Sequence, residues 1–298
     1  MKTFNQTVSD FLVLSNDSSG TTLAKTLINI GTHKVLSLSD WSFLKDSKSI
    51  SSGTGVQNYN PPYNMAKMEY VNYWYGGVWY TPKEIRDGET WTQLTAVSTV
   101  TSAIPQYWYI SNRTHKIGLC PASTNSKGTI KMGFTKKIRD FSVSDYSTGS
   151  ISASANGTIF TGTSTNWTDL MAGRFLQVSA GTTVAHGYWF EITAVGSSTS
   201  LNVKESIPSD ISAGTYTISE TIPLPDGFED IPLWYALNQY YQMKLQPVLA
   251  REYGIMYKEG IQDLLMRDSR SVTGLIEKDE PISMYDVNSN PWTIGTIQ

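Results

Sequence analysis

The sequence predicts an α+β protein: an antiparallel β-sheet core, an inserted small β-sandwich-like module, and a C-terminal helical hairpin or kinked long helix. Aromatic and β-branched runs separated by turn residues between positions 65 and 141 indicate the sheet. A Ser/Thr/Gly-rich stretch with single apolar positions indicates the module, and apolar spacing of three to four residues over 228–266 indicates the helices. The predicted parts are 1–143 (an N-terminal helix plus the sheet), 144–221 (the module), 222–270 (the helices, packed with 1–143) and 271–298 (an extended arm).

The overall composition excludes several classes of protein. The 298 residues are 40% hydrophobic, which is enough for a buried core, and only 16% are charged. The net charge of -3 gives no general attraction to phosphate, so tight binding of nucleic acid is not expected. Cys120 has no partner for a disulfide and is expected to be a buried, inert side chain. The chain contains no run of 18 uncharged apolar residues, so we expect no membrane association.

The first 64 residues predict one helix followed by a loop. Leu23, Leu27 and Ile30 follow a helical rhythm within residues 22–38, and the Ser/Thr residues at its start can cap it. Residues 47–64 are polar and contain two consecutive prolines, Pro61 and Pro62, so we expect an irregular loop there.

The sheet is expected from three segments. Residues 65–85 form two aromatic runs around Gly76 and Gly77, and paired glycines supply the positive φ angles of a tight hairpin turn. Residues 106–120 and 128–141 are expected to complete the same antiparallel sheet.

The module over 144–221 shows four strand-like runs bounded by turn residues. Its expected core consists of Trp167, Phe175, Trp189, Ile192, Val195, Leu201, Val203 and Tyr216. Beyond it, Asp226 is the expected helix cap, and Pro247 predicts either two helices that meet near residues 245–247 or one sharply kinked helix. From residue 268 onward the sequence has no lasting period.

Signatures of catalysis are missing from the sequence. It has no nucleophile elbow, no phosphate-binding glycine loop and no metalloprotease motif. His33, His115 and His186 lie in three separate segments without ligand spacing. The acidic pairs Glu229/Asp230 and Asp279/Glu280 fit a solvated helix end and a flexible arm better than acid-base catalysis. We therefore expect no enzyme, no cofactor and no metal.

Two groups of aromatic residues are candidates for binding. Tyr73, Trp74 and Trp79 in the hairpin could stack on sugars or single-stranded nucleic acid, although strand alternation should bury about half of such rings. The helical segment carries aromatic residues on more than one face, which suits either a subunit interface or packing within the chain. The expected interface residues are Trp234, Tyr235, Tyr240, Tyr241, Tyr253 and Tyr257, together with Ile282, Tyr285 and Trp292 of the arm.

Residues 222–265, with Ala236, Leu237, Tyr240 and the Tyr-x-x-Gly run at 257–260, resemble the carboxy-terminal helices of head-to-tail adaptor (connector) proteins of tailed bacteriophages. The order of a Leu-rich helix, the hairpin and the strand pair around residues 117–134 is similar to that family as well. The segment 156–178, with a Thr-Gly-Thr run, Trp167 and Met171-x-Gly173-Arg174, resembles a small β module of phage virion proteins.

The resemblance implies a mechanical function. The expected role is that of a virion structural protein, assembled in the cytoplasm of a bacterial host. It would form a homo-oligomeric ring of twelve copies between the portal protein and the tail proteins, with genomic DNA only passing through its channel. The acidic balance fits a channel that does not grip DNA. The alternatives are a carbohydrate-binding tail or fibre component, suggested by the aromatic hairpin and the β module, and a cell-wall hydrolase, suggested only by scattered carboxylates.

Overall fold

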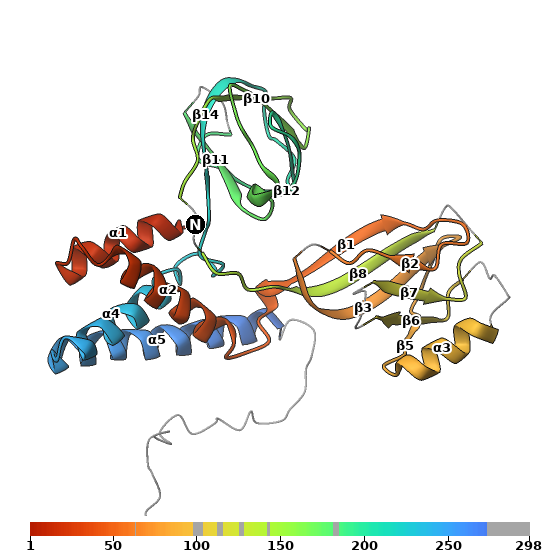
Figure 1. Ribbon diagram of the computed structural model, residues 1–298, viewed down its shortest axis with the longest axis horizontal. Helices are drawn as coiled ribbons and strands as arrows, with labels where there is room; N and C mark the ends of the chain where they lie inside the picture. The colour runs from red at the N-terminus through yellow and green to blue at the C-terminus, as the bar shows by residue number, and fades with distance from the viewer. Residues whose placement is uncertain are drawn as a thin grey trace, which may run out of the picture.

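The computed structural model describes residues 1–62, 64–97, 104–111, 116–124, 128–141, 144–180 and 185–272. These residues form three lobes, which Figure 1 shows around a common junction. The helical lobe contains both ends of the described chain, the sheet lobe comprises residues 45–136, and the barrel lobe comprises residues 146–219. Helices together with mostly antiparallel sheets confirm the α+β class.

The helical lobe packs four helices from opposite ends of the sequence. They are α1 (Phe4–Ser15), α2 (Thr21–Leu36), α4 (Ile231–Met243) and α5 (Pro247–Val272). Phe11, Ile28, Leu237 and Leu264 are among the side chains buried between them. Hydrophobic burial therefore joins residues more than 200 positions apart.

Helix α1 was not predicted, although its start carries a recognisable signal. The Thr3 hydroxyl accepts a hydrogen bond from the Gln6 backbone N–H at 3.0 Å, and the Gln6 side chain accepts one from the Thr3 N–H at 3.0 Å. This reciprocal capping box satisfies two backbone donors at the helix start.

Helices α4 and α5 are separate, which resolves the two alternatives raised by Pro247. Leu245 adopts a left-handed conformation with φ 56°, and Pro247 begins α5, where its missing N–H costs no hydrogen bond. The helix cap differs from the prediction, because Asp230 rather than Asp226 precedes α4 and makes no side-chain cap. Helix α5 also continues through residues 268–272, where no period was expected.

The sheet lobe contains two four-stranded sheets rather than the one predicted. The first has the order β1 (Lys45–Ser51), β8 (Thr129–Lys136), β3 (Met65–Tyr75) and β4 (Val78–Tyr80). The second has the order β2 (Asn58–Tyr59), β7 (Ile117–Cys120), β6 (Tyr107–Ile110) and β5 (Lys83–Glu84). Side chains of both sheets share one core, and α3 (Gly88–Val97) packs on the second sheet through Trp91, whose ring stacks on Tyr109.

Strand β1 lies where the irregular loop was expected to begin. Lys45 to Ser51 pair with β8, yet most of their side chains are exposed on both faces. An edge strand with polar residues on both faces shows no alternation of apolar and polar positions, so its pattern is that of a loop.

The predicted hairpin is present, with its turn at the two glycines. Tyr75 pairs with Val78, and Gly76 and Gly77 have φ angles of 60° and 87°. Two consecutive positive φ values are the requirement of the tight turn that matches strand twist.

The barrel lobe closes six strands rather than the four expected, so a sandwich-like module is not confirmed. The strands are β9 (Ser150–Ala153), β10 (Ile159–Thr163), β11 (Phe175–Ala180), β12 (Trp189–Ser197), β13 (Ser200–Val203) and β14 (Ile211–Ser219). Five of the eight expected core residues are buried, whereas Phe175, Trp189 and Val195 are only half-buried. In β11 and β12 the neighbouring Leu176 and Phe190 fill the interior instead, because side chains alternate along a strand.

Candidate interaction surfaces

The predicted interface tyrosines bind the helices to one another within the chain. Tyr241 is buried, its hydroxyl donates to the Leu14 carbonyl at 2.7 Å, and its ring stacks on that of Tyr253. Tyr235 and Tyr257 pack together with ring centroids 5.4 Å apart, and burial raises the pKa of Tyr257 to about 12. The Tyr257 phenol is therefore neutral at pH 7. All four tyrosines serve mainly as large half-apolar packing groups.

The remaining two predicted aromatic residues of the helices also contact their own chain. The Tyr240 hydroxyl donates to the Asp17 carboxylate at 3.0 Å. Trp234 is half-buried, and a Cβ atom added at Gly260 would lie 2.7 Å from its ring. Only a glycine at position 260 lets α5 approach α4 this closely. An additional role of these residues at a subunit interface stays a prediction.

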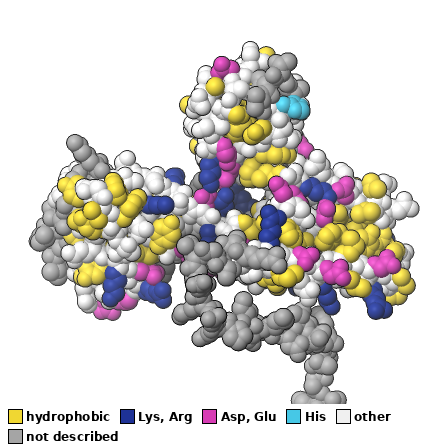
Figure 2. Space-filling view, turned by 180° about the vertical axis from the view of Figure 1, so that it is seen from behind, with side chains coloured by type: hydrophobic (Ala, Val, Ile, Leu, Met, Phe, Trp, Pro, Cys, Tyr) yellow, Lys and Arg dark blue, Asp and Glu magenta, His cyan; other side chains and the backbone are white. Residues whose placement is uncertain are grey.

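The outward face of α5 carries apolar side chains that are not among the predicted interface residues. Val248, Ile255 and Met266 are 69%, 45% and 50% exposed. On an ideal helix they fall within about 20° of one line, since they are spaced by 7 and 11 residues. Leu245, at the tip between α4 and α5, is also exposed. Figure 2 shows apolar side chains gathered on the surface of the helical lobe.

Charged residues flank this apolar line asymmetrically. On an ideal helix three acidic side chains lie about 20–60° to one side of the line, and two basic side chains lie about 60–80° to the other. Arg267 lies about 100° round on the acidic side, and its guanidinium donates to the Asp226 carbonyl at 2.8 Å. The acidic flank comprises Glu252, Glu259 and Asp263, and the basic flank comprises Arg251 and Lys258; all five are exposed.

The predicted aromatic platform is divided between the two faces of β3. Tyr73 is completely buried, and its hydroxyl lies 2.7 Å from that of Ser123. Trp74 points to the opposite face and packs against Trp79, with ring centroids 5.2 Å apart and planes inclined by 52°. Trp79 is 48% exposed, so the surface group is this tryptophan pair without Tyr73.

A cluster of four charges, here called the junction cluster, connects the barrel lobe to the sheet lobe. Asp46 on β1 lies 2.7 Å from Lys204, which follows β13, and 3.3 Å from Lys136 on β8. Glu191 on β12 lies 3.2 Å from Lys136 and 3.8 Å from Lys204. Burial acts to raise the pKa of Asp46, but the hydrogen bond from Lys204 and the nearby cations outweigh it and lower that pKa.

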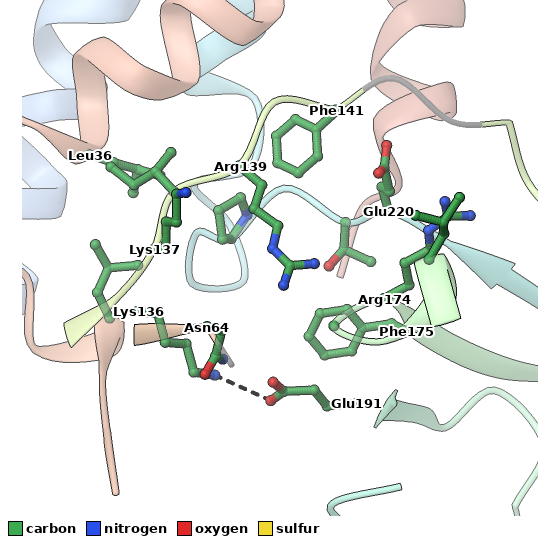
Figure 3. A pocket seen from close by; sticks show the side chains of 16 residues that line it. Leu36, Asn64, Lys136, Lys137, Arg139, Phe141, Arg174, Phe175, Glu191 and Glu220 are labelled. Carbon is green, nitrogen blue, oxygen red and sulfur yellow. Dashed lines mark hydrogen bonds and ion pairs between the residues drawn. The ribbon is translucent and has the colours of Figure 1, made fainter. Parts of the chain in front are cut away.

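The junction also contains a cleft of about 140 Å³, here called the junction cleft, bordered by all three lobes. Figure 3 shows the contact between Lys136 and Glu191 among the lining residues, with Arg139 and Arg174 projecting from different segments. The Arg139 guanidinium donates to the Ala172 carbonyl at 3.0 Å. No sequence pattern pointed to this cleft, since its residues come together only in the fold.

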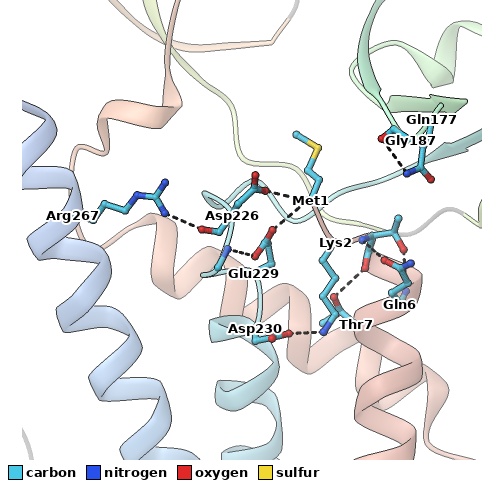
Figure 4. Close-up of polar contacts among 12 residues, drawn as sticks. Met1, Lys2, Gln6, Thr7, Gln177, Gly187, Asp226, Glu229, Asp230 and Arg267 are labelled. Carbon is cyan, nitrogen blue, oxygen red and sulfur yellow. Dashed lines mark hydrogen bonds and ion pairs between the residues drawn. The ribbon is translucent and has the colours of Figure 1, made fainter. Parts of the chain in front are cut away.

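The start of the chain is attached to the helical lobe by ion pairs, shown in Figure 4. The Met1 amino group lies 3.0 Å from Asp226 and 3.5 Å from Glu229. The Lys2 ammonium pairs with Asp10 and Asp230. Glu229 and Asp230, weighed above as an acid-base pair, thus serve as partners of these amines.

Other expected or excluded sites can be placed within the described ranges. His33 lies 2.7 Å from Asp140, and His186 lies 2.9 Å from the Ser179 carbonyl, whereas His115 and the arm residues Ile282, Tyr285 and Trp292 lie outside the described residues. Among the residues that the structure describes, no three His, Cys, Asp or Glu side chains are grouped to hold a metal ion. In the same part of the chain, no helix has both the length and the apolar character to cross a bilayer.

No protein-family model matches this chain, and no curated protein matches its sequence.

Proposed function

We propose that the chain is a virion structural protein that forms an oligomeric ring between the portal and the tail of a bacteriophage. The outward face of α5 is the observation that carries this proposal. Val248, Ile255 and Met266 form an apolar line there, and a neighbouring copy would remove it from water.

The charges beside that line favour contact between different flanks of identical copies. The acidic flank of one α5 complements the basic flank of the next, whereas contact between like flanks would be repulsive. Such a head-to-tail contact uses two different surfaces of each copy and closes into a ring when the rotation between copies allows it. In this proposal twelve copies surround a genome channel, and the inserted barrel lobe is held outside the ring.

Assembly with the portal tests the proposal. The full-length chain is mixed with portal-containing particles and imaged by cryo-electron microscopy, and we expect a ring with the helical lobe towards the portal. The double substitution Val248→Asp/Ile255→Asp should abolish the ring and leave the subunit folded, because both side chains are exposed. Ile159→Asp on the barrel lobe is the control, since it makes the same type of substitution at another exposed apolar position and should permit assembly. A chain that never joins portal-containing particles would refute the proposal.

The exposed tryptophan pair favours one other function, a carbohydrate-binding tail or fibre component. Trp79 presents about half of its surface to solvent next to Trp74, and sugars stack on such rings. Binding on a glycan array that disappears with Trp79→Ala would support this function. An array without signal would count against it.

A further inference from the structure

The junction cleft contains a buried cation without a described partner. Arg174 is only 6% exposed and borders the cleft, and its guanidinium has no hydrogen bond or ion pair with any described residue, while its nitrogens keep some contact with solvent. The other cations that line the cleft are Lys136, Lys137 and Arg139, against two carboxylates, Glu191 and Glu220. Four cationic groups therefore face two anionic ones.

Part of this positive charge is already engaged. Lys136 contacts Asp46 and Glu191, and Arg139 donates to the Ala172 carbonyl. Arg174 is the largely buried cation of the cleft for which no partner is described, although its nitrogens are not completely shielded from solvent. A buried charge is costly unless it is paired, and a guanidinium pairs best with a planar carboxylate or a phosphate that accepts two hydrogen bonds.

The walls of the cleft are apolar as well as basic. Four apolar side chains line it: Leu36 of α2, Leu44 of η1 (Ser42–Leu44), Phe141 in the segment that follows β8, and Phe175 of β11. An isolated inorganic anion would make no apolar contact with these side chains. An occupant that joins a carboxylate to neighbouring apolar residues uses both features of the cleft.

We propose that residues 275–282 of this same chain, with the sequence LIEKDEPI, occupy the junction cleft, and that a carboxylate of Glu277, Asp279 or Glu280 pairs with Arg174. The segment combines three acidic residues with Leu275, Ile276, Pro281 and Ile282. Its excess of negative charge complements the excess of positive charge in the cleft.

The end of α5 lies close enough for the segment to reach the cleft. The Asp268 carboxylate accepts a hydrogen bond from the Ser42 backbone N–H at 3.1 Å, and Leu44, two residues further on, is part of the cleft wall. The helix adds about 6 Å from Asp268 to Val272 at 1.5 Å per residue. Five further residues, up to Glu277, can span about 17 Å when extended. Figure 1 shows the end of α5 beside the start of β1, at the junction of the lobes.

Carbodiimide cross-linking of the full-length chain tests this contact. The reagent joins a lysine amine to a carboxylate in contact with it, with loss of water, and Lys137 is an exposed amine at the cleft. Peptide mass spectrometry should find Lys137 linked to Glu277, Asp279 or Glu280. Lys83, an equally exposed lysine on the sheet lobe, is the matched control and should not form these links.

Two variants separate the proposed pairing from chance contact. Arg174→Gln should lower the yield of the Lys137 links by about tenfold, because a charge-assisted hydrogen bond is lost, while Arg174→Lys should retain part of the yield. If Arg174→Gln does not fold, the contact is tested from its other side by the triple substitution Glu277→Gln/Asp279→Asn/Glu280→Gln. This variant leaves all described residues unchanged. It should leave residues 275–282 as accessible to proteases as residues 290–298, whereas the unchanged chain should protect 275–282.

Three outcomes would overturn the inference. They are equal linking of Lys137 and Lys83, a yield unaffected by a folded Arg174→Gln chain, and links found only between two copies of the chain. The contact is measured in the free subunit. Its absence would therefore leave the ring proposal standing, and failure of ring assembly would leave the contact standing.

Discussion

Removing the charge of Asp46 should weaken the attachment of the barrel lobe to the sheet lobe. Asp46 contacts Lys204 across the junction at 2.7 Å and Lys136 on its own sheet at 3.3 Å. The carboxylate is largely covered, whereas the Lys204 side chain is 42% exposed, so solvent screens the pair. Two unit charges at this distance attract by about 1.5 kcal/mol at the dielectric constant of water, and exposed pairs are measured at about 0.2–1 kcal/mol. We expect a coupling of about 1 kcal/mol between Asp46 and Lys204.

A double-mutant cycle with Asp46→Asn and Lys204→Met measures that coupling by urea unfolding. The pKa of Asp46 in the folded chain lies below its ordinary value of 3.8, so its contribution is fully present above about pH 4 and disappears as the pH falls through the folded pKa. Burial acts to lower the pKa of Lys204, but hydrogen bonding to Asp46 and nearby carboxylates raise it above 10.5. The coupling should therefore also disappear as the pH rises through that folded pKa.

The cycle gives a clear refutation. A coupling that is equal at pH 7 and well below the folded pKa of Asp46 would show that charge attraction is not its source. A second cycle that neutralises Lys67 and Glu69, an ion pair within β3, is the matched control. It should leave the attachment of the barrel lobe unchanged.

Three further predictions each test one feature of one lobe. Leu237→Ala should lower the free energy of unfolding by about 2–5 kcal/mol, because its side chain is fully buried among the helices; urea denaturation measures it. Gly77→Val should cost about 1–3 kcal/mol, since φ is 87° there, whereas Gly76→Asn should be tolerated in the same turn; thermal unfolding compares them. Tyr216→Phe removes the acceptor of the buried Trp167 indole N–H, 2.9 Å away, and should cost about 1–3 kcal/mol; the change in Trp fluorescence during unfolding reports it.

The sequence predicts those elements best whose signals are local. The turn at Gly76 and Gly77 and the break before Pro247 follow from backbone geometry that few residues permit, and both are found in the structure. Helix α1 also has a local signal, because Thr3 and Gln6 stand at the spacing of a capping box just before its apolar residues.

Features that depend on distant residues could not be predicted in this way. The exposed strand β1 is identified by its pairing with β8, not by its own pattern. In the barrel lobe Phe190 is buried, whereas its neighbour Trp189 is only half-buried. Two adjacent apolar residues do not show which of them faces the interior, because a shift of one residue exchanges the two faces of a strand. The junction cluster forms only where the barrel lobe meets the sheet lobe, and the cleft that Arg174 borders forms only where all three lobes meet.

The order of the helices has a consequence for how the protein is made. Helices α1 and α2 leave the ribosome first, but α4 begins only about 195 residues after α2 ends. At roughly 5–20 residues per second, about 10–40 seconds of synthesis separate the two halves of their shared core. The strands of the barrel lobe, by contrast, all lie within residues 150–219 and can pair as soon as that stretch emerges. We expect nascent chains to contain a folded barrel lobe while α1 and α2 still expose the apolar surface that α4 and α5 later cover, and a chaperone would find its binding site there.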